Sequence, residues 1–281
     1  MNLSEFKIVA DSSADLTTLE NMNFASVPMK INTNEKEYVD TADLDVVQMV
    51  DELLNYSGKS HTACPGIGDW LDAFGDAKYV FCVTITSGLS GSYNSAEAAR
   101  MQYEEQYPDR HVFVIDSLSA GPELKLIIEK LQELITEGKE FEEICTLIKE
   151  YQKHTALIFT LESLTNFANN GRVSPLLAKA VGLLGIRIVG KASDVGQLEP
   201  LSKPRGEKKA LLTMMDFLSN MNYSGAKLRI GHCFNEPAAL KMKELILGKY
   251  ASADIEIYPL RGLCSFYAEN GGVLIGFECN A

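Results

Sequence analysis

The stretch Tyr79-Val-Phe-Cys-Val-Thr-Ile-Thr-Ser-Gly-Leu-Ser-Gly-Ser-Tyr93 indicates the fold class of this 281-residue chain. Residues 79–85 are rich in β-branched and aromatic side chains, which is typical of a strand buried on both faces. Small polar residues follow, and the run 94–103 then favours a helix. A buried strand, a polar turn and a helix in this order predict one unit of a parallel α/β sheet.

The same order recurs on both sides of this stretch. Strand-like runs at 6–10 and 111–115 end in the polar turns Asp11-Ser-Ser-Ala-Asp15 and Asp116-Ser117. Because repeated strand-then-helix order implies parallel pairing, we expect residues 1–155 to form an α/β domain with helices on both faces of a mainly parallel sheet. The other elements expected there are a strand at 27–31 and helices at 44–54, 123–137 and 141–153.

Residues 156–281 are expected to form a second α/β domain, since the chain exceeds the usual single-domain length of about 100–150 residues. The segment 161–177 reads as helical but is broken by Asn169-Asn-Gly171, where glycine suits a left-handed helix cap. No Pro- or Ser-rich linker marks the boundary near residue 155, so we expect a tight connection and a ligand cleft between the domains. The remaining expected elements are strands at 156–160, 187–189, 227–230, 255–258 and 273–277 and helices at 206–220 and 237–247.

The composition is that of an acidic globular protein. Lys and Arg number 26 against 38 Asp and Glu, and the resulting net charge of −12 disfavours nucleic acid and anionic membrane surfaces. The chain shows neither a signal peptide nor an apolar run of about 18 residues, so we expect no membrane-spanning helix. Its six cysteines are scattered singly, which indicates buried free thiols in a reducing cytoplasm and no zinc site.

A nucleotide cofactor is not expected. The segment Gly185-Ile-Arg-Ile-Val-Gly-Lys-Ala192 has the spacing of a phosphate-binding P-loop, but Ala192 stands where Ser or Thr would hold magnesium. Its interior also favours a strand rather than a flexible loop, and no other nucleotide motif is evident.

Three polar turns follow predicted strands, at residues 11–13, 87–93 and 116–117. In open α/β sheets, ligands bind beyond the carboxyl ends of the strands. The turn at 87–93 also opens a helix, whose free N–H groups favour a negative charge. Taken singly, each turn is equally consistent with helix capping. Together they favour a site that recognises an anion or a hydroxyl group.

A serine esterase or thioesterase is the alternative interpretation. Gly88-Leu-Ser-Gly-Ser92 comes close to the nucleophile elbow Gly-x-Ser-x-Gly, but Ser92 replaces the glycine that allows the sharp turn. Ser90 would be the nucleophile, and His232, just after a predicted strand, is the best candidate for its base. A structural role is the more common one for a histidine in such a core-like segment.

The ordered set of short motifs resembles the DegV family over nearly the whole chain. The motifs are Asp11-Ser-Ser-Ala-Asp-Leu16, Thr62-Ala-Cys-Pro65, Ser87-Gly-Leu-Ser-Gly-Ser-Tyr93, Val114-Ile-Asp-Ser117, Leu161-Glu-Ser-Leu164, Asn170-Gly-Arg-Val-Ser174 and Lys203-Pro-Arg205. The resemblance implies a two-domain α/β protein, with a mixed sheet in the C-terminal domain, that holds one long-chain fatty acid between its domains. It implies a bacterial lipid-binding protein without its own catalysis.

In some members of this family, a separate fatty acid kinase subunit phosphorylates the bound carboxylate to an acyl phosphate for phospholipid synthesis. The resemblance therefore implies a long-chain fatty acid and a kinase subunit as partners, with transient membrane contact for lipid exchange. A further interpretation is a regulatory binding module whose lipid has only a structural role. Formation of acyl phosphate in the presence of a kinase subunit and ATP would distinguish the lipid carrier from this module.

The family's site residues carry over to individual positions of this chain. Thr62 and Ser90 match the hydroxyls that hold the carboxylate, and Gly91 would supply a backbone N–H. Tyr267 stands where the family has a histidine that touches the carboxylate, so it keeps a hydrogen-bond donor but loses a positive charge. Arg172 matches an arginine near the entrance.

Three further positions bear on the resemblance. Arg205 matches an arginine implicated in meeting the kinase subunit. Residues 63 and 64 depart from the family pattern, since Ala63 replaces the usual serine and Cys64 stands where glutamine is frequent.

Overall fold

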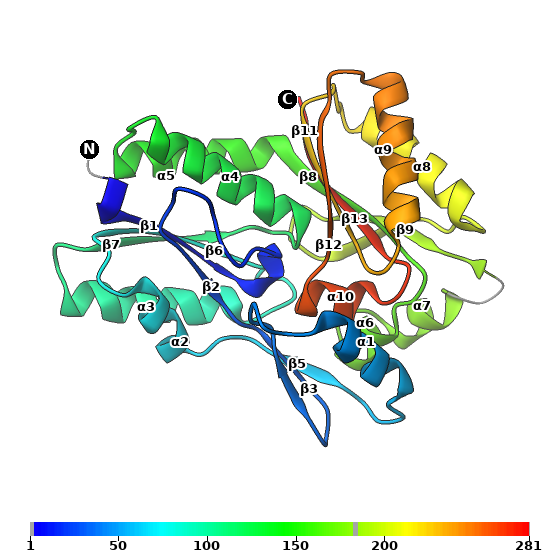
Figure 1. The fold of residues 1–281 in the computed structure, drawn as a ribbon, viewed down its shortest axis with the longest axis horizontal. Coiled ribbons are helices and arrows are strands. Elements are labelled where there is room, and N and C mark those ends of the chain that lie inside the picture. Colours follow the sequence, from blue (N-terminus) through cyan, green and yellow to red (C-terminus); the bar gives the residue numbers. More distant parts are fainter. Residues whose placement is uncertain (1–2, 182–184, 281) are drawn as a thin grey trace.

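The computed structural model describes residues 3–181 and 185–280 and shows a mixed α/β protein with two main sheets (Figure 1). The first sheet is parallel, in the order β2-β1-β6-β7, and the second has six strands in the order β10-β9-β8-β13-β11-β12. The predicted combination of a parallel sheet and a mixed sheet is confirmed.

Helices cover both faces of the parallel sheet, as the alternating pattern of the sequence predicts (Figure 1). Ile8 of β1 packs against α4 and α5, whereas its neighbour Val9 faces α2 and α3, because successive side chains of a strand point to opposite faces. The strands are β1 (Phe6–Asp11), β2 (Phe24–Val27), β6 (Tyr79–Thr84) and β7 (His111–Asp116), and the helices are α2 (Ile67–Phe74), α3 (Ser92–Gln106), α4 (Pro122–Thr136) and α5 (Phe141–Tyr151).

The mixed sheet is covered on one face by α8 (Glu207–Asn220) and α9 (Glu236–Lys249). Helix α4 contacts β8, β11 and β13 of this sheet as well as β1 and β6 of the parallel sheet, so it joins the two parts of the chain. The strands are β8 (Thr155–Leu161), β9 (Ile188–Ala192), β10 (Leu198–Ser202), β11 (Lys227–His232), β12 (Asp254–Pro259) and β13 (Val273–Glu278).

The predicted strand at 27–31 is wrong as a single element. Strand β2 ends at Val27, and β3 (Lys30–Asn32) belongs to a small antiparallel sheet with β4 (Glu37–Val39) and β5 (His61–Ala63). Pro28 has no N–H for a sheet hydrogen bond, and the Met29 N–H donates instead to Ser12 Oγ at 3.0 Å. The chain therefore leaves one sheet and enters another.

The helices α1 (Val46–Asn55), α2 (Ile67–Phe74) and α10 (Gly262–Ala268) also differ from expectation. The predicted helix at 44–54 begins slightly later, as α1. The predicted break in the helical segment 161–177 is confirmed, because α6 (Thr165–Asn169) ends there, Gly171 lies in the left-handed region with φ of 71°, and α7 (Pro175–Ala180) follows. The helices α2 and α10 were not expected from the sequence.

Buried carboxylates of the N-terminal part hold the start of α10. Asp15 accepts a hydrogen bond from the Arg261 N–H at 2.8 Å, and Asp40 accepts from the N–H groups of Gly262 and Leu263 at 3.0 and 2.9 Å. These contacts satisfy N–H groups that the first turn of a helix leaves free. They fix the position of α10, which carries several residues of the site described below.

Asp15→Asn is expected to change how stability depends on pH. Burial raises the pKa of Asp15 to about 7, opposed by the Arg261 N–H and assisted by Asp40. Since the pKa is higher in the folded state, Asp15 stabilises the fold below about pH 4, and this stabilisation is lost as pH rises to about 7. The asparagine variant lacks this titration, so its stability relative to wild type should rise by the order of a few kcal/mol across this window.

Urea unfolding at a series of pH values from 4 to 8 measures this difference. Asparagine keeps the acceptor for the Arg261 N–H and tolerates the left-handed backbone of residue 15, whose φ is 57°. Glu123, whose pKa burial also raises to about 7, is present in both proteins and cancels in the comparison. Parallel stability curves for the two proteins would contradict the expectation.

Candidate functional site

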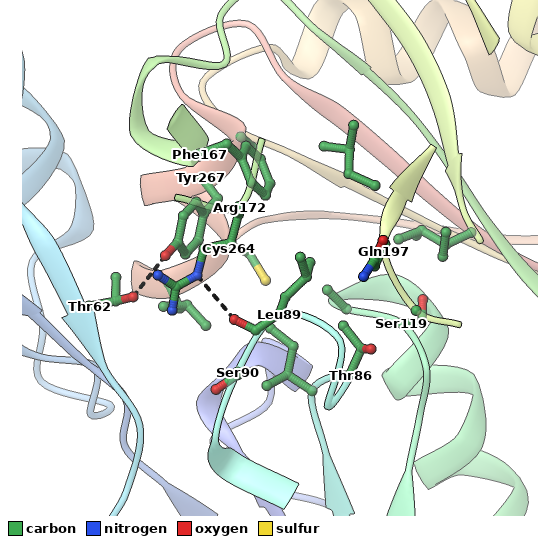
Figure 2. A pocket seen from close by; sticks show the side chains of 18 of the residues that line it. Thr62, Thr86, Leu89, Ser90, Ser119, Phe167, Arg172, Gln197, Cys264 and Tyr267 are labelled. Carbon is green, nitrogen blue, oxygen red and sulfur yellow. Dashed lines mark hydrogen bonds between the residues drawn. The ribbon is translucent and has the colours of Figure 1, made fainter. Parts of the chain in front are cut away.

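An apolar cavity of about 320 Å³ lies between the two main sheets, within the usual size range of ligand pockets. Strand β8 forms one wall of the cavity. Because successive side chains of a strand point to opposite faces of the sheet, Leu157, Phe159 and Leu161 line the cavity, whereas Ile158 packs under α8 and α9. Other apolar lining residues include Met29, Ile85 and Leu89 from the parallel-sheet part and Leu274 from β13. Figure 2 shows the cavity from close by.

Two hydroxyl groups meet at one end of this cavity. Thr62 Oγ1 of β5 and the Tyr267 hydroxyl of α10 are 2.8 Å apart, although 205 positions separate them in the chain (Figure 2). Burial raises the pKa of Tyr267, opposed by Thr62 and Arg172, so the phenol stays neutral and can donate a hydrogen bond. This end of the cavity can therefore offer neutral donors to an oxygen-bearing group.

Ser90 and Gly91 line the cavity from the turn between β6 and α3. Gly91 is the N-cap residue of α3, and Ser90 Oγ accepts a hydrogen bond from the Ser92 N–H at 3.2 Å. The Ser90 hydroxyl hydrogen therefore remains available to a ligand. The adjacent helix start adds a partial positive charge, which favours an anionic group.

The other two predicted polar turns are not part of the cavity wall, which corrects the expectation of three converging turns. Asp11 accepts hydrogen bonds from the Ile85 N–H at 2.9 Å and from Ser92 Oγ at 2.6 Å. Asp116 accepts from the Ser87 N–H at 3.0 Å. Both carboxylates thus hold residues 85–92 in place, and their oxygens accept hydrogen bonds from N–H and O–H groups of the protein rather than from a ligand.

Arg172 lies at the same end of the cavity as Thr62 (Figure 2). Its Nε donates to the Leu89 carbonyl at 3.1 Å, and its guanidinium also donates to the Asn170 carbonyl. Asn170, which sequence reasoning did not single out, accepts from the Thr62 N–H at 3.1 Å. The loop between α6 and α7 therefore ties together both elements that carry the predicted hydroxyls.

Arg205 is exposed and does not line the cavity. It lies just before α8, where its backbone forms an isolated bridge with Ile186. The structure thus separates the two arginines that the sequence singled out, with Arg172 at the cavity and Arg205 on the surface.

The structure does not assemble the alternative pair of Ser90 and His232. His232 ends β11, does not line the cavity, and its Nδ1 has no hydrogen-bond partner among residues 3–181 and 185–280. Burial lowers its pKa, opposed by Glu236. Within the same residues, no hydrogen bond joins His232 to Ser90, so the relay that activates a serine nucleophile is not formed in this structure.

Cys64 differs from the expectation that all the thiols are buried, because it is exposed and lines the cavity beside Gly91. The sequence carries no signal for this, since β5 and the loop after it are too short to show a pattern. Across the described part of the chain, no group of His, Cys, Asp and Glu side chains is arranged to hold a metal ion. None of the helices described is both long enough and apolar enough to cross a membrane.

The fold and the site define the class of the protein. It is a two-sheet α/β protein whose two parts are joined through α4 and enclose an apolar cavity with hydroxyl groups at one end. Residues 5–278 match the family described as uncharacterised proteins of the DegV family. The chain belongs to the DegV family, which confirms the resemblance drawn from its motifs. A DegV domain-containing protein of Streptococcus pneumoniae is 45% identical over 277 residues, covering 97% of this chain and 99% of that protein.

Two solved structures are similar over nearly their whole length. The Fatty Acid Kinase (Fak) B3 protein of Streptococcus pneumoniae, loaded with linoleic acid, has a TM-score of 0.96 at 45% identity, covering 98% of this chain and 99% of that one. A DegV family protein from Eubacterium eligens, loaded with heptadecanoic acid, has a TM-score of 0.96 at 46% identity, covering 98% of this chain and 100% of that one.

Proposed function

We propose that this protein binds one long-chain fatty acid between its two domains and has no catalytic activity of its own. The observation that carries the proposal is the apolar cavity with Thr62, Tyr267 and Ser90 at one end. Proteins of the same fold at 45–46% identity hold fatty acids, which supports the same ligand class here. The change from the parallel to the mixed sheet at Thr155 supports the domain boundary at 155/156.

The carboxylate is placed at the hydroxyl end of the cavity. Thr62, Ser90 and Tyr267 donate hydrogen bonds to its oxygens, and Gly91 adds a backbone N–H at the start of α3. A buried carboxylate without such partners costs several kcal/mol. The apolar tail lies along Leu157, Phe159 and Leu274, and its burial contributes about 0.8 kcal/mol per methylene. Burial of the tail thus supplies most of the affinity, and the hydroxyl groups offset the free-energy cost of burying the carboxylate.

Exposure of the hydroxyl end supports presentation of the carboxylate to a kinase subunit. Gly91 and Cys64 both line the cavity and are exposed, so this end lies close to solvent. A fatty acid kinase subunit would transfer a phosphoryl group to a carboxylate oxygen there and form an acyl phosphate. In this proposal the protein works in the cytoplasm, takes part in phospholipid synthesis, and exchanges lipid by transient membrane contact.

Mass spectrometry of an organic extract of the purified protein tests the binding step. A fatty acid present at about one molecule per chain is expected. Purified protein that holds no fatty acid, and that takes up none when one is added, would overturn the proposal. A fluorophosphonate probe and p-nitrophenyl esters test for esterase activity, and labelling of Ser90 would favour the alternative function.

Arg205→Glu is expected to lower acyl phosphate formation by a fatty acid kinase subunit and ATP at least ten-fold, because in this proposal the exposed guanidinium pairs with acidic groups of that subunit. Fatty acid affinity should be unchanged, since Arg205 does not line the cavity. Lys241→Glu on α9 makes the same charge change at another exposed position and serves as the control. Equal loss in both variants would contradict a specific role for Arg205.

A further inference from the structure

A second group of polar side chains lines the cavity on the side opposite Thr62 and Tyr267. Figure 2 shows Thr86, Ser119 and Gln197 on one side of the cavity and Thr62 and Tyr267 on the opposite side. Thr86 follows β6, Ser119 precedes α4, and Gln197 lies in the hairpin between β9 and β10. The carboxylate site does not use this group, and it lies where an alkyl tail would run.

Ser119 is 2% exposed, and its Oγ has no hydrogen-bond partner among the residues that the structure describes. Its backbone is satisfied: its N–H donates to Ser117 Oγ at 3.1 Å, and its carbonyl accepts from the Thr86 N–H at 2.9 Å. Burial raises the pKa of the neighbouring Glu123 carboxyl and the nearby Ser119 hydroxyl opposes this rise, although the two groups form no hydrogen bond of normal geometry. The Glu123 carboxyl accepts from Thr155 Oγ1 at 2.7 Å.

The neighbouring groups are held firmly around this serine. Thr86 is 1% exposed, and its Oγ1 accepts from the Gly88 N–H at 3.0 Å, which leaves its hydrogen free to donate to a ligand. Gly196 has a φ of 69°, and a Cβ there would overlap the Thr86 side chain, so the hairpin that carries Gln197 packs directly against Thr86. The backbone around Thr86, Ser119 and the hairpin is therefore fixed before any ligand binds, whereas the Gln197 side chain is exposed.

A plain alkyl tail gives these groups no partner. It would cover Ser119 with methylene or methyl groups and leave a buried hydroxyl unsatisfied, which is unfavourable. A hydroxyl on the tail would accept from Thr86 or Ser119 and donate to Ser119 or to the Gln197 amide oxygen. A fatty acid that carries such an oxygen therefore matches both ends of the cavity.

We propose that Ser119, together with Thr86 and Gln197, forms a second binding subsite that recognises a hydroxyl group on the tail of a hydroxy fatty acid. The inference rests on the proposed function and names a narrower ligand class for the same cavity. In a wholly apolar tunnel, a tail hydroxyl weakens binding because it loses its hydrogen bonds to water. A preference for one hydroxylated acid over its parent thus requires a polar partner within the cavity.

Competitive displacement of a fluorescent fatty acid from the delipidated protein tests the subsite. The ligands are stearic acid and a series of hydroxystearic acids that each carry one hydroxyl at a different carbon. We expect at least one positional isomer to bind about five-fold or more tightly than stearic acid. Ser119→Ala should remove this preference and leave the affinity for stearic acid nearly unchanged.

Thr160→Val is the matched control. Thr160 Oγ1 is also buried without a hydrogen-bond partner in the described part of the chain, but Thr160 does not line the cavity, so its substitution should keep the preference. The inference is overturned if stearic acid binds and every hydroxystearic acid binds no more tightly, or if the preference survives Ser119→Ala. Failure of wild type to bind either kind of acid would instead overturn the proposed function.

Discussion

Ala192→Trp is expected to weaken binding of a long-chain fatty acid by at least fifty-fold while leaving the protein folded. Ala192 lies on β9, directly opposite Leu198 of β10, and both residues line the cavity. An indole at this position would occupy the space of the tail. Each methylene excluded from the cavity costs about 0.8 kcal/mol, so loss of only three methylenes already corresponds to roughly fifty-fold.

Titration of the delipidated variant with palmitic acid measures this effect, and thermal unfolding shows whether the fold is kept. Val195→Trp is the control, because Val195 lies in the adjacent hairpin, is 65% exposed, and does not line the cavity. Affinity at the wild-type level in Ala192→Trp, with the fold intact, would show that the tail lies elsewhere and would contradict the proposed function.

The double variant Thr62→Val with Ser90→Ala is expected to bind a long-chain fatty acid about a hundred-fold more weakly. Each hydroxyl that donates to a carboxylate contributes about 1.5 kcal/mol or more, and a carboxylate left without partners in the cavity adds to the loss. Thr62→Val also removes the group that Tyr267 contacts at 2.8 Å. The effect should thus exceed that of either single change.

A fatty alcohol of the same chain length separates loss of the carboxylate contacts from general damage to the cavity. Its affinity should fall far less in the double variant, because the alcohol carries no charge that needs several donors. Thr160→Val replaces a buried hydroxyl outside the cavity and should leave both ligands unaffected. Equal weakening of the acid and the alcohol would show that the two hydroxyls do not hold the carboxylate.

The regular elements were largely predictable because their signals are local. Residues 79–85 form β6 with little error, and the helices at 123–137 and 141–153 appear as α4 and α5. The errors occur where the local signal is short or ambiguous. Pro28 divides one predicted strand between two sheets, and α10 has seven residues of mixed character, too few for a clear periodic pattern.

The resemblance, rather than any local pattern, brought together residues that line one cavity, and their roles in binding stay a prediction. Thr62, Ser90, Gly91, Tyr267 and Arg172 all line the cavity, as the motif matches imply for a shared site. The roles of other polar residues could not be read in the same way. A buried aspartate in a polar turn looks the same in sequence whether it binds a ligand or, like Asp11, holds the backbone N–H groups of the next turn.

The amino-acid sequence by itself determined the α/β class, the order of most strands and helices, and the family to which the chain belongs. These properties depend on hydrophobic periodicity and short motifs, which act over a few residues. Only the tertiary structure decided that Thr62 meets Tyr267, that Asp15 and Asp40 hold α10, and that the Ser119 hydroxyl lines the cavity with no hydrogen-bond partner among the residues described. These contacts join residues that are far apart in the chain. They depend on how the two sheets and their helices pack against each other, which local sequence patterns do not specify.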